Sequence, residues 1–367
     1  MPVKIAASGS WLRRTCVLGS ALLFATILPG ASHPSAKAAT SASSSFEDTR
    51  LDRITVSGLH NAFEESKSGR LTDALDKGAR LLEIDVYSTY SGTGGWVVSH
   101  SNPLINDNNC TYKVGKWIFQ TTQRNGNLRT CLDNLSDWSE AHPDHDPIYI
   151  KLELKWGFRK KAGKGPADLD SLIKNHIGTH RIFKPSDMTG TAYPTLDAAA
   201  KADAWPTWQQ LRGKFILYPI TGTIENKLAG YDLDNLSTAK EYAAHVRDLA
   251  STGKLDQAMM WPDMHPTSST GDPRTIYEPS LRPWFVMFDT QAVNWLGGGH
   301  DMAWYCSNHY LTTATAAANV PPALDKTNPD PTAAAERVTH LAQHGASAVT
   351  HDWMNAPGAL TVQSRNC

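Results

Sequence analysis

A short stretch near residue 80 alternates apolar and charged positions in the pattern of a β-strand, Arg80-Leu81-Leu82-Glu83-Ile84-Asp85-Val86-Tyr87. Successive side chains of a strand point to opposite faces, so this stretch has an apolar face, with Leu82, Ile84 and Val86, and a polar face, with Glu83, Asp85 and Tyr87. Two ionised carboxylates enclosed on one face repel each other and lose hydration unless a cation compensates them. Calcium, which prefers hard oxygen ligands, is the cation that this pair favours.

Three further stretches have strand patterns with polar residues at or near their ends. Residues 54–58 lead to His60-Asn61, and residues 96–99 lead to His100. Residues 147–155 alternate almost throughout, with a polar face that carries Tyr149, Lys151, Glu153 and Lys155. Strands that present polar groups at their C-terminal ends, with helices between them, are typical of a parallel (β/α)8 barrel.

The rest of the chain repeats this alternation of strands and helices. Buried strands are predicted over residues 214–219, 258–262, 284–289 and 346–351, and helices over residues 70–78, 132–141, 237–251 and 331–343. With the four strands of the first half, the predicted strands number eight. We therefore predict an α/β fold, a (β/α)8 TIM barrel of irregular or distorted form, as a single domain over residues 49–367.

The first residues of the chain have the pattern of an export signal. Lys4, Arg13 and Arg14 precede an apolar run over residues 16–27 that is too short to span a membrane, and Ala36-Lys37-Ala38 offers small residues for cleavage. We predict a signal peptide over residues 1–38, a disordered leader over residues 39–48 and a secreted, extracellular protein. The Arg13-Arg14 pair leaves both the general secretory and the twin-arginine routes open.

Charge and cysteine content disfavour nucleic-acid binding and a zinc site, and they favour disulfides. Removal of residues 1–38 takes away four basic groups and leaves 31 Lys and Arg against 36 Asp and Glu, a net charge of −5, which disfavours nucleic-acid binding. Four cysteines remain, and an even number in an exported protein favours two disulfides, with three possible pairings. We favour Cys110–Cys131, which closes a local loop, and Cys306–Cys367, which fixes the C-terminus. A zinc site is disfavoured because the chain has no Cys-x-x-Cys spacing.

The polar motifs, taken in chain order, resemble a known enzyme family. His60-Asn61, Glu83-x-Asp85, His100 and Glu153-x-Lys155 resemble the calcium-dependent branch of the phosphatidylinositol-specific phospholipase C family, over residues 54–155. The resemblance implies that His60 is the general base and His100 the general acid, and that Asn61, Glu83, Asp85 and Glu153 bind calcium. It also implies attack by the inositol 2-hydroxyl, which yields diacylglycerol and inositol 1,2-cyclic phosphate.

The residues themselves agree with this chemistry. A phosphodiester resists attack because its oxygens are already negative, so a cation must neutralise the charge that grows in the transition state. One imidazole can remove a proton from the attacking hydroxyl while a second protonates the leaving oxygen. We expect Lys155 to contact the phosphate. Expected partners are a phospholipid or an inositol phosphodiester and, transiently, a membrane surface, which Trp117 or Trp295 could enter; we expect a monomer.

Other interpretations of the same residues remain open. His60 and His100 could each cap a strand end, and Glu153 could pair with Lys151 or Lys155 inside the barrel. A glycerophosphodiester phosphodiesterase or a sphingomyelinase D-like enzyme also has a Glu-x-Asp pair, although Arg-Gly follows the first histidine of such glycerophosphodiesterases, where Asn61-Ala62 stands here. A secreted barrel that binds a phosphorylated ligand without catalysis is the third alternative. Asp289 and His351-Asp352 end later strands and could contact the headgroup.

Overall fold

The computed structural model describes residues 46–89, 95–114, 121–225, 237–266 and 271–367. The chain divides into two units, Met1–Thr40 and Ser41–Cys367. The predicted signal peptide and most of the predicted leader lie outside the described residues; residues 46–48 form a turn in which the carbonyl of Glu47 accepts a hydrogen bond from the amide of Gln209. Among the described helices, none has the length and apolar character that a membrane span requires.

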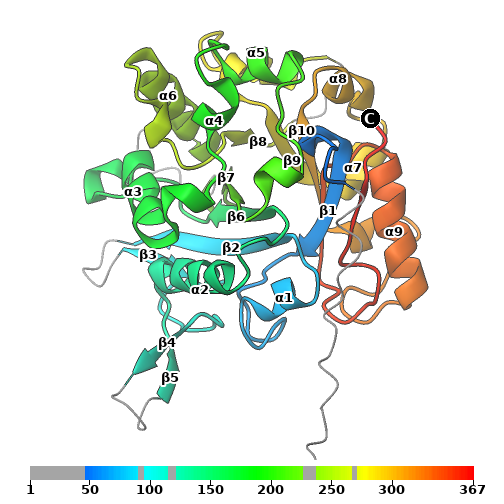
Figure 1. Cartoon of the computed structure of the whole chain (residues 1–367). Helices are drawn as coiled ribbons and strands as arrows, with labels where there is room; N and C mark the ends of the chain where they lie inside the picture. The colour runs from blue at the N-terminus through cyan, green and yellow to red at the C-terminus, as the bar shows by residue number, and fades with distance from the viewer. Residues whose placement is uncertain (1–45, 90–94, 115–120, 226–236, 267–270) are drawn as a thin grey trace, which may run out of the picture. The chain divides into compact units, whose positions relative to one another are not determined.

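Within the second unit, eight strands form the wall of a barrel (Figure 1). They pair in the order β7-β6-β2-β1-β11-β10-β9-β8, and every pairing along this path is parallel. Their bounds are β1 Ile54–Leu59, β2 Leu81–Ser88, β6 Ile148–Leu154, β7 Phe215–Thr221, β8 Asp263–Met264, β9 Met287–Gln291, β10 Leu311–Thr315 and β11 Ala348–His351. Among the described residues, an isolated bridge from Leu217 to Met260 is the one β-bridge between the two ends of this path. The predicted distorted (β/α)8 barrel is confirmed.

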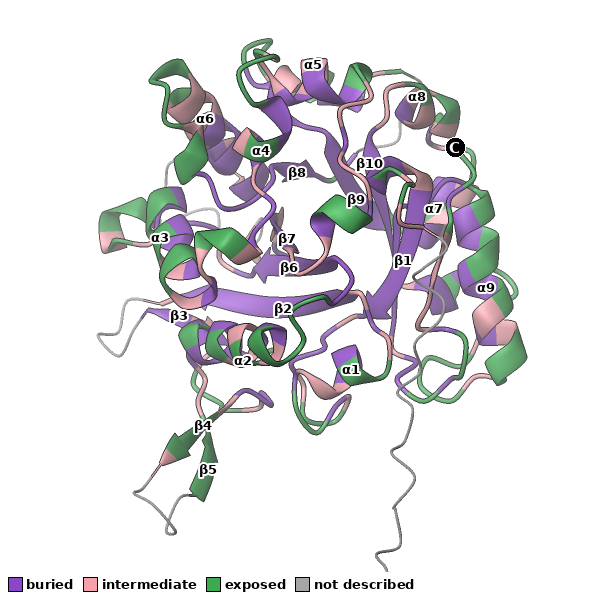
Figure 2. Ribbon diagram, in the orientation of Figure 1, coloured by how far each residue is buried: buried purple, intermediate pink, exposed green. Residues whose placement is uncertain are grey.

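Helices lie around the strands (Figure 2), with buried residues on the side that faces the barrel and exposed residues outside. Their bounds are α1 Asp73–Asp76, α2 Leu128–Ala141, α3 Pro166–Ile177, α4 Pro185–Thr189, α5 Leu196–Lys201, α6 Thr238–Ser251, α7 Ala292–Leu296, α8 Met302–Ser307 and α9 Pro331–Gln343. The three longest begin at polar caps, because the side chains of Asn127, Ser237 and Asp330 accept hydrogen bonds from amides of the first turn. Strands β2 and β6 are buried on both faces, as strands of a parallel barrel require.

One predicted wall strand was wrong, and one wall strand was missed. The predicted strand over residues 96–99 is β3, Trp96–Val98, and it pairs antiparallel with β2 as a return strand outside the parallel wall. The eighth wall strand is instead β10, whose sequence Leu-Thr-Thr-Ala-Thr has too few large apolar residues to be recognised. Its buried Thr312 donates a hydrogen bond to the carbonyl of Gly345, which satisfies the hydroxyl inside the fold.

Disulfides and short strands complete the fold. The disulfides are Cys110–Cys131 and Cys306–Cys367, as predicted. The first joins α2 to the base of an exposed hairpin formed by β4, Thr111–Val114, and β5, Thr121–Arg124. The second ties the C-terminus to α8. Strand β12, Val362–Ser364, pairs antiparallel with the first half of β1.

Candidate active site

Strands β2 and β6 bring three of the predicted carboxylates together. Asp85 is directly opposite Glu153 in the register of the two strands, and Glu83 is opposite Lys151. Because Leu59, the last residue of β1, is level with Leu82, these side chains lie just beyond the C-terminal end of β1. The polar face of β2 that the sequence predicts is therefore the inner face of the barrel at its C-terminal end.

The carboxylate cluster has the composition of a cation site. One oxygen from each of Glu83, Asp85 and Glu153 lies within 4.8 Å of the others, and all three side chains are buried. Asn61 follows β1 with φ of 52°, a left-handed conformation that asparagine tolerates, and its side chain is buried beside the cluster. Asn61 Oδ1, Glu83 Oε2 and Asp85 Oδ1 have no hydrogen-bond partner. Three buried oxygens without donors fit a hard cation such as calcium.

His60 stands at one side of this cluster and is held by Asp352. Its Nδ1 lies 3.2 Å from Asp352 Oδ1, and its Nε2 lies 3.7 Å from Glu83 Oε2. Lys67 in turn contacts the second oxygen of Asp352 at 2.8 Å. Burial lowers the pKa of His60, but the charges of Glu83 and Asp352 outweigh burial and raise this pKa to about 9. A cation bound to Glu83 would remove part of that cause and lower the pKa again.

His100 stands at the other side of the cluster, in the loop that follows β3. Its Nδ1 lies 3.1 Å from Asp85 Oδ2, 3.1 Å from Asn61 Nδ2 and 3.4 Å from Glu64 Oε1. The hydrogen bond with Asp85 raises the pKa of His100, and burial opposes this effect only in part. The side chain is 49% exposed, so Nε2 can reach a bound molecule. His100 thus reaches the site from the return strand, whereas the sequence predicted the end of a parallel strand.

Lys155 lies inside the cluster. Its Nζ is 2.8 Å from Asp85 Oδ2 and 2.9 Å from Glu153 Oε1. The amide and hydroxyl of Thr223 also donate to Glu153 Oε1, at 2.8 and 2.9 Å. Burial raises the pKa of Glu153, but Lys155 and Thr223 outweigh burial and lower it, whereas burial raises the pKa of Asp85 to about 6. Glu153 therefore pairs with Lys155, as one of the alternatives predicted, and also belongs to the carboxylate cluster.

A second charged layer lies deeper in the barrel. Lys151 Nζ is 2.9 Å from Asp289 Oδ2 and 3.4 Å from Glu83 Oε1. Burial raises the pKa of Asp289 although Lys151 opposes it, and burial together with the charge of Asp289 raises the pKa of Asp263 well above its ordinary value. Through Lys151, this layer contacts Glu83 of the carboxylate cluster. The sequence had indicated Lys151 and Asp289 but not Asp263.

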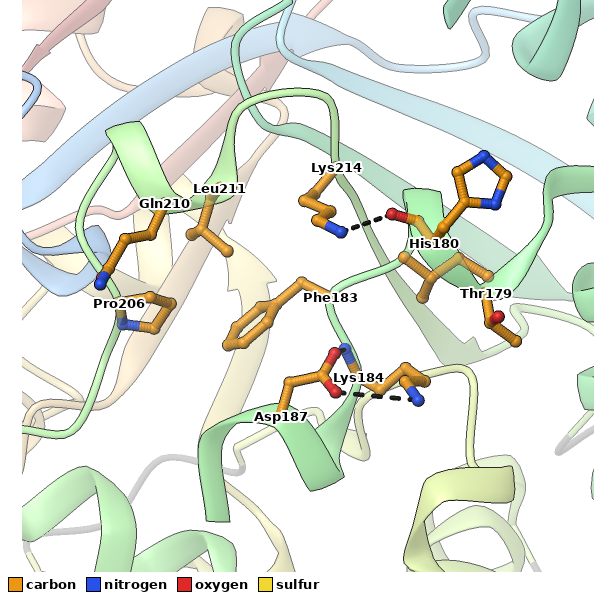
Figure 3. A pocket seen from close by; sticks show the side chains of 10 residues that line it. Thr179, His180, Phe183, Lys184, Asp187, Pro206, Gln210, Leu211 and Lys214 are labelled. Atoms are coloured by element: carbon orange, nitrogen blue, oxygen red, sulfur yellow. Dashed lines mark hydrogen bonds and ion pairs between the residues drawn. The ribbon is translucent and has the colours of Figure 1, made fainter. Parts of the chain in front are cut away.

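Two other features lie away from the cluster. Asp52, Asp203 and His309 also converge, but the guanidinium of Arg53 already contacts Asp52 at 3.0 Å and Asp203 at 3.2 Å. A cavity of about 350 Å³ lies elsewhere in the fold, and Figure 3 shows the side chains that line it. Its lining residue Phe183 bonds to Phe215, the first residue of β7, so the cavity lies at the opposite end of the barrel from the carboxylates.

The sequence located all seven proposed site residues at one end of the barrel but missed two that hold them. Asp352, expected only as a possible headgroup contact, orients His60, and its place directly after β11 was the available signal. Thr223, which donates hydrogen bonds to Glu153, lies just after β7, and this position was its only indication in the sequence.

Comparisons with known proteins identify a family of similar sequence and fold. A family model described as calcium-dependent phosphoinositide phospholipase C matches residues 32–227, more than half of the chain. A calcium-dependent phosphatidylinositol-specific phospholipase C from Streptomyces antibioticus has 43% sequence identity and a TM-score of 0.80, over 87% of this chain and 100% of that chain.

A more distant structure shares the fold. It is a calcium-dependent phosphoinositol-specific phospholipase C from a Gram-negative bacterium, Pseudomonas sp., with 20% identity and a TM-score of 0.62 over 88% of this chain and 97% of that chain. Among curated proteins no match was found. The family match and the identity to the Streptomyces antibioticus enzyme show that the chain belongs to the calcium-dependent phosphoinositide phospholipase C family.

Proposed function

We propose that this calcium-dependent phospholipase C cleaves phosphatidylinositol by general acid–base catalysis, with His60 as the base and His100 as the acid. The single observation that carries the proposal is the placement of two carboxylate-bound imidazoles on either side of the three unpartnered buried oxygens. Family membership favours this enzyme over a glycerophosphodiester phosphodiesterase, a sphingomyelinase D-like enzyme and a non-catalytic barrel.

Each histidine forms a hydrogen bond with a carboxylate through Nδ1, which leaves Nε2 for proton transfer; His60 Nε2 lies 3.7 Å from Glu83 Oε2, beyond hydrogen-bond distance. His60 Nδ1 donates to Asp352, so Nε2 accepts the proton of the inositol 2-hydroxyl, whose oxygen then attacks phosphorus. His100 Nδ1 is engaged with Asp85, so Nε2 delivers a proton to the departing glycerol oxygen. The products are diacylglycerol and inositol 1,2-cyclic phosphate.

We assign calcium to Asn61, Glu83, Asp85 and Glu153, which supply hard oxygens from β2, β6 and the segment after β1. When bound, calcium neutralises the negative charge that grows on the phosphate oxygens. Lys155, whose ammonium group lies among these ligands, is placed to contact the same phosphate.

We propose that membrane contact occurs through the loop that carries His100. Leu104 is 92% exposed and Ile105 is 52% exposed, and they lie four and five residues after His100 in this loop. The turn is fixed, because the amides of Leu104 and Ile105 donate to the side chain and the carbonyl of Asn102. By contrast, Trp295 is buried and donates to the carbonyl of Thr313, which excludes it as the lipid contact, and Trp117 lies outside the described residues.

We also propose a secreted monomer. Two disulfides are typical of exported proteins, and the apolar run near the N-terminus has the pattern of a signal peptide. We expect the purified protein to sediment as a single species with the mass of a monomer. A species with the mass of a dimer would contradict the monomer.

Phosphorus NMR of phosphatidylinositol incubated with the purified protein tests the reaction. The expected first product is the five-membered cyclic phosphate, which has a resonance well separated from those of phosphomonoesters. Phosphatidic acid or a free phosphomonoester as the first product contradicts attack by the inositol 2-hydroxyl.

A further inference from the structure

The ammonium group of Lys155 is a cation already present inside the proposed calcium site. The side chain is only 5% exposed, and its Nζ contacts Asp85 at 2.8 Å and Glu153 at 2.9 Å. These two carboxylates face each other across β2 and β6. The lysine therefore compensates the charge of two ligands that would otherwise repel each other in a buried place.

Within Asp85, the oxygen that Lys155 contacts is not the oxygen that lacks a hydrogen-bond partner. Lys155 contacts Asp85 Oδ2, and Asp85 Oδ1 has no hydrogen-bond partner. A similar division holds for Glu83, where Lys151 lies 3.4 Å from Oε1, while Oε2 has no hydrogen-bond partner and lies 3.7 Å from His60 Nε2. The lysines thus leave one oxygen of each carboxylate open toward the cluster while a positive charge stays on the other.

We propose that Lys155 is a resident cation of the calcium site: it holds Asp85 and Glu153 together in the calcium-free protein and weakens the binding of calcium. This inference rests on the calcium ligands assigned above. If Lys155 stays in place when calcium binds, its charge repels the ion; if it moves away, two ion pairs are broken. Both routes lower the affinity for calcium, so the sign of the effect does not depend on which one occurs.

The consequence is a calcium requirement set by the protein. A site with three carboxylates and no internal cation would bind calcium tightly, whereas a site with Lys155 fills only where calcium is abundant, at about 10⁻⁴–10⁻³ M as in extracellular modules. The calcium-free protein keeps its carboxylates compensated until that concentration is reached. This role is additional to phosphate contact, and the two are separable by experiment.

Calorimetric titration of calcium into the metal-free protein at pH 8 tests the inference. We expect Lys155→Met to lower the calcium Kd by about tenfold or more, since a neutral side chain of similar length removes the charge. Lys155→Gln, whose amide still donates a hydrogen bond, is a second neutral variant and should shift Kd in the same direction. Lys155→Arg, which keeps the charge, and Lys184→Met, which removes a lysine paired with Asp187, should stay near wild type.

Thermal unfolding gives a second readout. We expect metal-free Lys155→Met to melt below the wild-type protein and to gain more in Tm on calcium addition. An unchanged or higher calcium Kd in both neutral variants overturns the inference, and a raised KM with an unchanged Kd would make Lys155 a phosphate ligand only. A wild-type protein that binds no calcium overturns both the ligand assignment and this role.

Discussion

At the scale of single residues, the two proposed catalytic histidines differ in what surrounds them. His60 is fixed between Asp352 and Glu83, and both carboxylates stabilise its protonated form. His100 is half exposed and is fixed only through Nδ1. This asymmetry suits a base that must be aligned with one hydroxyl and an acid that must reach leaving groups of varied shape.

The division of roles predicts different responses to the leaving group. We expect His60→Ala and His100→Ala each to lower turnover of phosphatidylinositol by about 10²–10⁴-fold, because each removes one proton transfer. With a soluble inositol phosphodiester that carries a good leaving group, activity of His100→Ala should be partly restored and that of His60→Ala should not. Steady-state rates on both substrates measure this.

Circular dichroism is the control for folding of these variants. If His60→Ala were restored and His100→Ala were not, the roles would be reversed. Near wild-type turnover of phosphatidylinositol by either variant would remove that histidine from the mechanism.

A buried histidine next to the site makes stability depend on pH. His351 accepts a hydrogen bond from the amide of Trp353 at Nδ1, and its Nε2 donates to the carbonyl of Ala359, so the neutral form is required. Burial lowers its pKa from 6.5 to about 4. Because the unfolded chain binds the proton more readily, this contribution is full above pH 6.5 and is lost as pH falls toward 4.

We therefore expect urea unfolding to show about 2 kcal/mol less stability at pH 5 than at pH 7 from this residue alone. The matched variant is His351→Gln, which cannot titrate and should lose that part of the pH dependence. Equal slopes of stability against pH in the two proteins would contradict the assignment.

At the scale of elements, the loop after β3 carries both His100 and the residues that we propose as the membrane contact. It carries His100 and, four residues later, the exposed Leu104 and Ile105. The side chain of Asn109 donates to carbonyls of Ala62 and Ser68, which fixes the loop to the segment after β1. Insertion of this loop into a bilayer would therefore bring the catalytic end of the barrel to the lipid headgroups.

The double variant Leu104→Ser/Ile105→Ser should bind vesicles of phosphatidylinositol and phosphatidylcholine at least several-fold more weakly, since it removes the two aliphatic side chains that would enter the lipid. Its rate on a soluble substrate should be unchanged. Vesicle sedimentation and a soluble-substrate assay separate the two effects.

Ile276→Ser is the matched control, because Ile276 is also exposed, at 56%, but lies in the segment of Arg274, which stacks over Tyr310 at the opposite end of the barrel. If both proteins lost vesicle binding equally, the effect would be general, and the loop would have no special role.

The same loop shows what alternation in the sequence cannot decide. Alternation identified β3 as a strand but not its direction, which depends on the connection to its neighbour. Only residues 89–95 separate β2 from β3, fewer than a parallel crossover needs, so connection length was the signal to use. For β10 no comparable signal existed, because its threonines become strand residues only through long-range bonds such as Thr312 to Gly345.

At the scale of the whole barrel, the carboxylates on β2 and β6 were predictable from the sequence, whereas the contact between His60 and Asp352 was not. Glu83, Asp85 and Glu153 could be predicted because strand alternation and charge place them on one face of adjacent strands. The bond between His60 and Asp352 joins residues 292 positions apart, and it forms because β11 pairs with β1, which brings the last and the first strands of the wall side by side. Contacts of this kind follow from topology rather than from local sequence.

The central claim, that the carboxylate cluster holds a calcium ion required for catalysis, is tested by one titration. Turnover of phosphatidylinositol is measured after exhaustive chelation and again as free calcium is restored, with the wild type and with Asp85→Asn. We predict no activity after chelation and recovery with a midpoint of about 10⁻⁴–10⁻³ M calcium, with less activity in Asp85→Asn at every concentration. Full wild-type activity after chelation, with no metal detected in the protein, would contradict the claim and leave Glu83, Asp85 and Glu153 as structural partners of Lys151 and Lys155.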